Sequence, residues 1–328
     1  MTSVACIGEC MIELRHVDDD SLALGFGGDT LNTAVYLARY AGAVGARVHY
    51  VTALGQDPYS DAMVRQWEAE GIGTDLVQRL EGRLPGLYFI RTDDDGERSF
   101  TYYRSAAAAR EMFAAGAAAT LSAQLAGFDW LYLSAVSVSI LDEQSRRVLW
   151  AALDRARAGG TRVAFDSNYR PAGWPDAAAA RAAVRATLRR VDLALPSLDD
   201  EQALFGDADA AGCAARLQRL GVAEVVVKQG RHGCLVSAGG SRQRVTTVAG
   251  RAVDTTAAGD AFNAGYLAAR IGGADAAAAA ACGHRLAGAV VGHPGAIIPI
   301  GVTPPLQLGV SAAAPRREDH GGAGARQP

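Results

Sequence analysis

Strand-like and helix-like hydrophobic patterns alternate along most of this chain. Residues 4–14 begin with an apolar run that breaks at Gly8, and apolar residues at helical spacing follow over 30–39. The later strand-like runs cover 47–55, 130–136, 161–168, 191–197 and 224–230, and the helical patterns cover 60–71, 141–160, 177–190, 199–206 and 213–221. Such alternation is typical of βαβ units. It predicts an α/β protein whose mostly parallel sheet is covered by helices on both faces.

Composition narrows the class of protein further. The 328 residues are 49% hydrophobic, and the net charge is −3 with no stripe of Lys and Arg, which argues against a nucleic-acid partner. No apolar run approaches the roughly 20 residues that span a bilayer, and the N-terminus lacks a signal pattern. We therefore expect a cytoplasmic protein without a membrane partner. The five cysteines form no C-x-x-C pair, and we expect each to be a small buried apolar group.

Two segments interrupt the alternation. Residues 83–105 contain two runs rich in aromatic and β-branched residues around Asp95-Gly96, a strong hairpin signal. Residues 11–26 also have an extended pattern. We expect these segments to form a small antiparallel sheet that stands off the main domain and acts as a lid. The tail over 311–328 has no apolar periodicity and is expected to be disordered.

A row of small residues, DTTAAGDAFN over 254–263, lies between a strand-like and a helical pattern. A loop of small residues before a helix directs backbone N–H groups at an anion. In this interpretation Ala257, Ala258 and Gly259 form an anion hole for a transferring phosphoryl group, and Asp260 accepts the proton of the attacking hydroxyl. The alternative, weighted equally on the residues alone, is that Thr255, Thr256 and Asp260 only cap the helix.

The same stretch resembles the second signature of the PfkB, or ribokinase-like, carbohydrate kinases, which usually reads D-T-T-G-A-G-D. Ala257 stands where most members have Gly, so its φ must be negative or the loop is strained. The A-A-G-D form is typical of the branch that phosphorylates 2-keto-3-deoxygluconate. The resemblance covers 3–300 and implies a three-layer α/β/α fold with a small β-sheet lid, in a single kinase domain over 1–310.

Two further motifs resemble parts of this family. FGGDTLNTAVYLARYAG, over 26–42, resembles its first signature, which implies that Gly27 and Gly28 allow close approach of a sugar and that Asn32 binds a hydroxyl. Asp29 lies beside them as a further substrate-binding candidate, or as an N-cap. VVVKQGRHGC, over 225–234, resembles the strand and turn along the nucleotide cleft, and it implies nucleotide-binding roles for the residues Lys228, Gly230 and Gly233. Lys228 could instead be a surface charge.

Two segments at the ends of other strand-like runs add candidates. In FDSNYRPAGW, over 165–174, the resemblance implies that Asn168 faces the phosphates and Arg170 the substrate, with a surface arginine as the alternative. The family's N-x-x-E element appears as 197–200, where Asp200 would act on Mg²⁺ through water. The implied cofactors are ATP and Mg²⁺, since Mg²⁺ prefers phosphate oxygens and water.

The lid segment bears on the substrate. If it closes over the acceptor, it contributes Tyr88, Tyr102, Tyr103 and Arg104, while Arg170 comes from the domain. Two guanidinium groups suit the carboxylate of a sugar acid. The alternative for each tyrosine is packing within the hairpin. The sequences GECMIEL, LPGLY and DDDGERSF also resemble those of the 2-keto-3-deoxygluconate branch. This resemblance implies ATP-dependent phosphorylation of 2-dehydro-3-deoxy-D-gluconate to its 6-phosphate.

Three other functions are alternatives to a sugar-acid kinase. A kinase of a neutral sugar such as fructose or ribose is the nearest alternative, followed by a non-catalytic sugar- or nucleotide-binding paralogue on the same fold. A nicotinamide dehydrogenase is disfavoured because no G-x-G-x-x-G follows the first strand. The lid would leave a sheet edge open, which indicates a homodimer joined through the lid.

Overall fold

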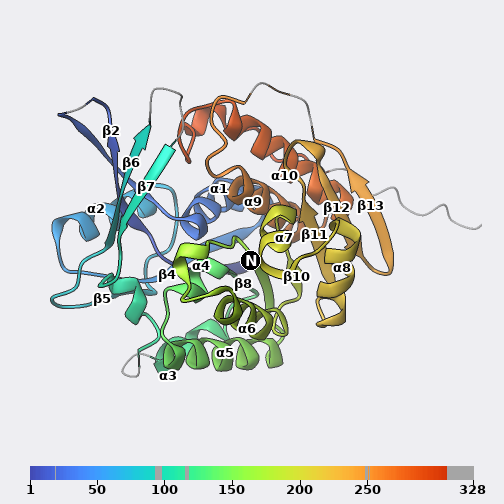
Figure 1. The fold of residues 1–328 in the computed structure, drawn as a ribbon, viewed down its shortest axis with the longest axis horizontal. Helices are drawn as coiled ribbons and strands as arrows, with labels where there is room; N and C mark the ends of the chain where they lie inside the picture. The colour runs from blue at the N-terminus through green and yellow to red at the C-terminus, as the bar shows by residue number, and fades with distance from the viewer. Residues whose placement is uncertain (19, 93–97, 115–117, 248–249, 251, 309–328) are drawn as a thin grey trace, which may run out of the picture.

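The chain folds into two sheets of unequal size, with helices around the larger one. The computed structural model describes residues 1–308 except 19, 93–97, 115–117, 248–249 and 251. Figure 1 shows the larger sheet in the centre and the smaller sheet, with β2, β6 and β7, at one end of the molecule. The tail predicted to be disordered, over 311–328, lies outside the described residues.

The larger sheet is mostly parallel, as predicted. Within the described residues it has nine strands in the order β13-β12-β11-β10-β9-β8-β1-β4-β5, and pairs are antiparallel at β11–β12 and β12–β13. Their bounds are β1 (Thr2–Ile7), β4 (Ala46–Leu54), β5 (Val77–Arg79), β8 (Trp130–Ser134), β9 (Arg162–Asp166), β10 (Leu193–Ala194), β11 (Glu224–Lys228), β12 (Cys234–Ala238) and β13 (Ser241–Val245). The strand predicted over 191–197 is much shorter because Pro196 has no N–H to donate to the ladder.

Helices cover both faces of this sheet, which confirms the three-layer prediction. One apolar core includes Leu31, Trp67 and Leu267 from the face of α1, α2, α9 and α10, and the other includes Leu149, Val184 and Leu217 from the opposite face. The helices are α1 (Asp29–Val44), α2 (Pro58–Ala69), α3 (Ala118–Leu125), α4 (Ala135–Ser139), α5 (Glu143–Ala158), α6 (Ala177–Leu188), α7 (Leu198–Phe205), α8 (Ala210–Arg219), α9 (Ala258–Ile271) and α10 (Ala276–Val291), with 3₁₀ turns η1 (Ala108–Glu111), η2 (Pro171–Gly173), η3 (Gly230–His232) and η4 (Ile300–Val302).

Close packing of α9 against α10 fixes the helix that follows the small-residue loop. A β-carbon at Gly265 would lie 3.0 Å from the carbonyl oxygen of Cys282, and one at Gly283 would lie 2.8 Å from the carbonyl oxygen of Phe262. Only glycine permits this separation of the two helices. The N-terminus of α9 is therefore held in one place relative to the sheet.

The smaller sheet has the order β3-β2-β6-β7 and is built from the predicted lid segments. Its strands are β2 (Met11–His16), β3 (Leu22–Gly27), β6 (Gly86–Thr92) and β7 (Arg98–Tyr103). Both hairpins are antiparallel, but β2 and β6 pair in parallel, so the prediction of an antiparallel sheet is wrong at its centre. In the chain, β2 follows β1 and β6 follows β5. Because β1 and β5 run parallel in the larger sheet, β2 and β6 also run in the same direction. The Asp95-Gly96 turn lies outside the described residues.

Two simpler expectations can be compared with the described residues. The five cysteines are free and buried, as predicted. Among the helices of the described residues, none combines the length and the apolar character that crossing a membrane requires.

Candidate active site

Asp260 lies in the first turn of α9, directly after the row of small residues. Its Oδ2 accepts a hydrogen bond of 2.9 Å from Nδ2 of Asn32 on α1. The N-cap of α9 is Ala257, and no side chain caps the helix. The alternative in which Thr255, Thr256 and Asp260 serve as helix caps is therefore not what the structure has.

The loop before Asp260 is strained at Ala257, which was expected to have either a negative φ or a strained conformation. Ala257 has φ of 58°, in the left-handed region, where an L-residue other than glycine costs roughly 1–2 kcal/mol. The amide of Ala258 donates a bond of 3.3 Å to the carbonyl of Thr255. The amide of Gly259 belongs to the first turn, where N–H groups lack intrahelical acceptors. The first-turn amide of Gly259 and the positive end of the helix dipole are features that suit an anion.

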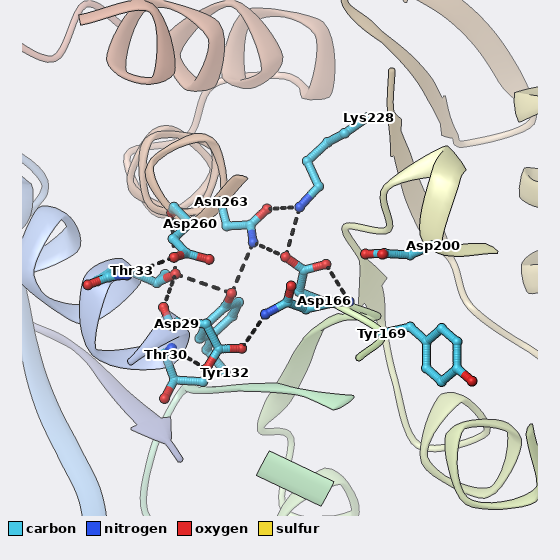
Figure 2. A network of polar contacts seen from close by, with 12 residues as sticks. Asp29, Thr30, Thr33, Tyr132, Asp166, Tyr169, Asp200, Lys228, Asp260 and Asn263 are labelled. Carbon is cyan, nitrogen blue, oxygen red and sulfur yellow. Dashed lines mark hydrogen bonds and ion pairs between the residues drawn. The ribbon is translucent and has the colours of Figure 1, made fainter. Parts of the chain in front are cut away.

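Three carboxylates meet beside this loop, and we call Asp29, Asp166 and Asp260, with Lys228 and Asn263, the carboxylate cluster (Figure 2). Lys228 Nζ donates to Oδ2 of Asp166 at 2.8 Å and to Oδ1 of Asn263 at 3.1 Å. Asn263 Nδ2 donates to the same Asp166 oxygen at 2.6 Å. Lys228 is thus a buried member of an ion pair, not a surface charge.

The cluster changes the protonation of Asp260. Burial first, and then the charges of Asp29 and Asp166, raise the pKa of Asp260 to about 8. The hydrogen bond from Asn32 and the charge of Lys228 act in the opposite direction. A carboxyl group with this pKa is suited to accepting a proton near neutral pH.

Lys228 also links the cluster to the loop. A β-carbon at Gly259 would lie 3.5 Å from Lys228 Nζ, so the ammonium group sits next to the first turn of α9. Gly230 and Gly233 shape the turn after β11, with φ of 53° and 83°. A β-carbon at Gly233 would meet the carbonyl oxygen of Val245 at 2.1 Å. In this structure these glycines have a clear conformational role.

The segment after β9 connects the cluster to a fourth carboxylate. Asn168 Nδ2 donates to Oδ2 of Asp29 at 2.6 Å. Arg170 is 60% exposed at its side chain and lies 3.5 Å from Oδ1 of Asp200. Burial and the charge of Asp166 raise the pKa of Asp200 to about 6, and Figure 2 shows its carboxylate turned toward Asp166.

Residues of the small sheet divide between its two faces. Tyr88 and Tyr102 pair across β6 and β7 with ring centroids 5.7 Å apart, and we call their side the inner face. Arg104, which follows β7, forms an ion pair with the buried Glu9. Tyr103 instead contacts Phe89 on the outer face, so the structure separates it from the other three lid candidates.

The two glycines of 26–42 allow close contacts at the base of the small sheet. A β-carbon at Gly27 would lie 2.2 Å from the hydroxyl oxygen of Tyr88, and one at Gly28 would lie 2.2 Å from the carbonyl oxygen of Glu9. Tyr88 donates its hydroxyl proton to Glu13. Asp29 is the first residue of α1 after the N-cap Gly28, so it is not itself the N-cap.

Several residues of this site were missed from the sequence. Asp166 lies in the same quoted stretch as Asn168, at the end of a strand, where its carboxylate was a detectable signal. Asn263 lies one helical turn after Asp260. Tyr132 lies in the middle of the buried strand β8, and its hydroxyl oxygen accepts a hydrogen bond of 3.0 Å from Nδ2 of Asn263. Glu9 lies two residues after the end of the first strand, yet nothing local to it identified Arg104 as its partner.

One other group of side chains has ligand-like spacing among the described residues. Oxygen and sulfur atoms of Glu201, Asp207 and Cys213 lie within 4.8 Å of one another. Arg216 forms ion pairs with Glu201 and Asp207 and supplies the positive charge there. This group is a buried ion-pair network and does not include the predicted metal residue Asp200.

Comparison with known proteins identifies the class. The model of the pfkB family of carbohydrate kinases matches residues 1–302, and the chain therefore belongs to this family of kinases. Its relatives include the 2-dehydro-3-deoxygluconokinase of Dickeya dadantii (strain 3937), which is 47% identical over 306 residues that cover 92% of this chain and 98% of the relative. The 2-dehydro-3-deoxygluconokinase of Escherichia coli (strain K12) is 46% identical, covering 90% and 97% of the two chains.

Solved structures agree with the fold. A fructokinase from Xylella fastidiosa, solved with bound ATP, superposes with a TM-score of 0.77 at 25% identity, covering 93% of this chain and 96% of that chain. The family match and this solved structure confirm the predicted ribokinase-like fold and the prediction of a carbohydrate kinase.

Proposed function

We propose that this kinase transfers the γ-phosphoryl group of ATP to the terminal hydroxyl of 2-dehydro-3-deoxy-D-gluconate, giving the 6-phosphate. The observation that carries the proposal is the carboxylate of Asp260, held by Asn32 in the first turn of α9 beside the small-residue loop. The names of the relatives at 46–47% identity support the sugar acid as the acceptor. The solved fructokinase with bound ATP supports the choice of nucleotide.

Asp260 acts as the general base. With a pKa of about 8 it can take the proton of the acceptor hydroxyl as the new P–O bond forms. The amides of Ala257 and Gly259 stabilise the negative charge that develops on the transferred group, and the amide of Ala258 joins them when it exchanges its 3.3 Å bond to the Thr255 carbonyl for the phosphoryl oxygen. Lys228, next to Gly259, balances that charge from the side of the sheet.

The nucleotide lies along the turn after β11. Lys228, Gly230 and Gly233 line it from the end of the strand, and Asn168 faces the phosphates from the segment after β9. This placement fits the rule that open α/β sheets bind ligands at the carboxyl ends of their strands.

Asp200 suits an outer-sphere role toward Mg²⁺. It presents hard carboxylate oxygens near Asp166, and its one ion-pair partner among the described residues is Arg170, at 3.5 Å. When bound, Mg²⁺ would supply charge neutralisation on the nucleotide phosphates. Asp200 would hold the metal through water, in the region of the cluster that faces the nucleotide.

The carboxylate of the sugar acid pairs with Arg104 and Arg170. Guanidinium groups bind carboxylates through oriented, charge-assisted hydrogen bonds, which a neutral sugar would not need. The ring of Tyr102 on the inner face lies 5.9 Å from Cζ of Arg104. Burial raises the pKa of Tyr102, and the charges of Arg104 and Arg170 oppose this effect. Gly27, Gly28, Asp29, Asn32 and Tyr88 surround the rest of the sugar. Tyr103 is left out of this arrangement because it lies on the outer face.

The outer face supports a homodimer joined through the small sheets. Leu24, which is 54% exposed, pairs in register with Leu14, and Phe89 lies beside Leu14 on the next strand. Tyr103 is 62% exposed on the same side. Sedimentation should show a dimer that Leu24→Lys converts to a monomer, and an unchanged dimer would contradict this part of the proposal.

Steady-state kinetics test the function directly. The protein is assayed with ATP and Mg²⁺ against 2-dehydro-3-deoxygluconate, fructose and ribose at equal concentrations. We expect kcat/KM to be at least about a hundredfold higher for the sugar acid, because the neutral sugars have no carboxylate to pair with Arg104 and Arg170. A higher kcat/KM for fructose or ribose would refute the sugar-acid assignment, and the absence of ATP turnover with all three would refute catalysis.

A further inference from the structure

A buried carboxylate connects the main domain to the small sheet. Glu9 lies between β1 and β2, and its side chain is 1% exposed. Its Oε2 accepts a hydrogen bond from Nη2 of Arg104, which follows β7 and lies 95 residues away in the sequence. We propose that Glu9 is a positioning residue that holds the guanidinium of Arg104 in the orientation that receives the carboxylate of the substrate. This inference rests on the proposed function and adds a determinant of its substrate class.

The guanidinium of Arg104 is held on two sides. Glu9 binds one amino group, and the Cζ atom of Arg104 lies 5.9 Å from the centre of the Tyr102 ring. Nε is buried and has no hydrogen-bond partner among the described residues. Nη1 also has no hydrogen-bond partner among the described residues, but unlike Nε it is not buried. It is therefore available to bind a ligand. Because the guanidinium is planar, fixing one nitrogen fixes the direction of the others.

Glu9 is itself fixed by close packing. A β-carbon at Gly28 would lie 2.2 Å from its carbonyl oxygen, and one at Gly86 would lie 2.8 Å from its Oε1. Gly28 is the N-cap of α1, the helix that carries Asn32, and Gly86 is the first residue of β6 of the small sheet. Glu9 is therefore enclosed between the acceptor-binding segment and the base of the small sheet. A shift of either one would move Glu9 and with it the guanidinium of Arg104.

Electrostatics connects the two residues in both directions. Burial raises the pKa of Glu9, and the charge of Arg104 opposes this effect. Oε1 of Glu9 has no partner among the described residues, so the bond from Arg104 to Oε2 is the one hydrogen bond of this carboxylate there. A buried carboxylate that lost this partner would be strongly unfavourable. The pair keeps Arg104 near the inner face even when no sugar acid is bound.

Glu9→Gln tests the proposal, since the amide keeps the shape of the side chain and removes its charge. With ATP and 2-dehydro-3-deoxygluconate we expect KM for the sugar acid to rise about tenfold, the cost of loosening one charge-assisted contact. The value of kcat should stay within about threefold and KM for ATP should not change, because neither depends on Arg104. A KM for the sugar acid within twofold of wild type would overturn the proposal.

Glu224→Gln is the matched control. Glu224 is also buried, and it pairs with Arg270 and Tyr266 at the start of β11, at the other end of that strand from Lys228. The control should lower the melting temperature without a change in KM. If both variants raise KM for the sugar acid equally, Glu9 has only a structural role and the proposal is wrong.

A double variant distinguishes action through Arg104 from independent action. In an Arg104→Ala background, Glu9→Gln should leave KM unchanged and should raise the melting temperature, because the unpaired buried charge is removed. A further tenfold rise in KM in that background would overturn the proposal. The wild-type assay separates the two claims: if the sugar acid is not a substrate of the wild type, the proposed function fails, whereas an active wild type with an unaffected Glu9→Gln refutes only this inference.

Discussion

The carboxylate cluster and the inner face of the small sheet differ in how completely their polar groups are paired. In the cluster, Asp166, Lys228 and Asn263 are buried and hydrogen-bonded to one another (Figure 2). On the inner face, Tyr102 is 49% exposed, and the guanidinium of Arg104 makes one hydrogen bond among the described residues. The first region is rigid before any ligand binds, and the second keeps donors open. We infer that the cluster carries the transfer chemistry and that the small sheet selects the acceptor.

The largest effect should come from the cluster. Asp260→Asn removes the proposed base and should lower kcat about 10³-fold or more, since general base catalysis contributes up to about 10⁴-fold. Kinetics with ATP and the sugar acid measure this loss. The matched control is Asp275→Asn at the N-cap of α10, which should remain fully active. If Asp260→Asn kept a tenth of the wild-type rate, the cluster would not be the centre of the chemistry.

The same variant should be more stable than the wild type at high pH. Because the pKa of Asp260 is raised in the folded state, the carboxyl favours folding fully only below its ordinary value of 3.8, and this contribution is lost as pH rises through about 8. Removing the charge should therefore raise the melting temperature more at pH 9 than at pH 5. Thermal unfolding at the two pH values measures it, and an equal change at both would contradict the raised pKa.

A smaller effect is expected at the small sheet. Arg104→Ala should raise KM for the sugar acid roughly 10- to 100-fold, with kcat changed less, because one charge-assisted contact is worth about 1.5–3 kcal/mol. Arg83→Ala is the control, since Arg83 pairs with Glu111. An equal rise in KM for fructose and for the sugar acid would mean that the inner face does not bind the carboxylate.

The pH profile offers a finer test of the cluster. The value of kcat/KM should rise as pH increases through about 8, because the base must be deprotonated. The hydrogen bond from Asn32 lowers the pKa of Asp260, so Asn32→Ala should move this limb to higher pH. Gln218→Ala, which removes a bond to Ser237, should leave the limb in place. If the rise of kcat/KM occurred at the same pH in Asn32→Ala as in the wild type, the titrating group would be one other than Asp260.

The comparison also explains what the sequence could predict of the fold. Strand and helix alternation depends on local periodicity, so the parallel sheet with helices on both faces followed from it. The parallel pairing of β2 with β6 did not, because it depends on where β1 and β5 lie in the larger sheet. The β12–β13 hairpin had a local signal that was not used, the Gly239-Gly240 turn with φ of 57° and 80°.

Prediction of the site had a similar limit. Residues inside contiguous motifs, such as Asn32, Lys228 and Asp260, could be named because each motif is read along the chain. The partners of these residues could not, since Lys228 meets Asp166 across 62 positions and Arg104 meets Glu9 across 95. Such pairings exist only after the sheet has formed. Lys228 is the clearest example, because its burial in an ion pair excludes the surface-charge alternative.

The smallest predicted effect concerns the strain in the loop itself. Ala257→Gly should relieve the cost of φ at 58°, roughly 1–2 kcal/mol, and lose about 0.5–1 kcal/mol through the greater freedom of glycine in the unfolded chain. The net result is a protein that is slightly more stable, by up to about 1.5 kcal/mol, with kcat within about threefold of wild type. Chemical denaturation and kinetics measure both.

Ala151→Gly on an exposed turn of α5 is the control and should destabilise by about 1 kcal/mol. If Ala257→Gly stabilises the fold but kcat falls tenfold or more, the alanine is what holds the first-turn amides in their reactive arrangement. The rigidity of the cluster would then extend into the loop, and the contrast with the open inner face would be sharper. A loss of stability equal to that of the control would instead show that the left-handed conformation costs the loop nothing.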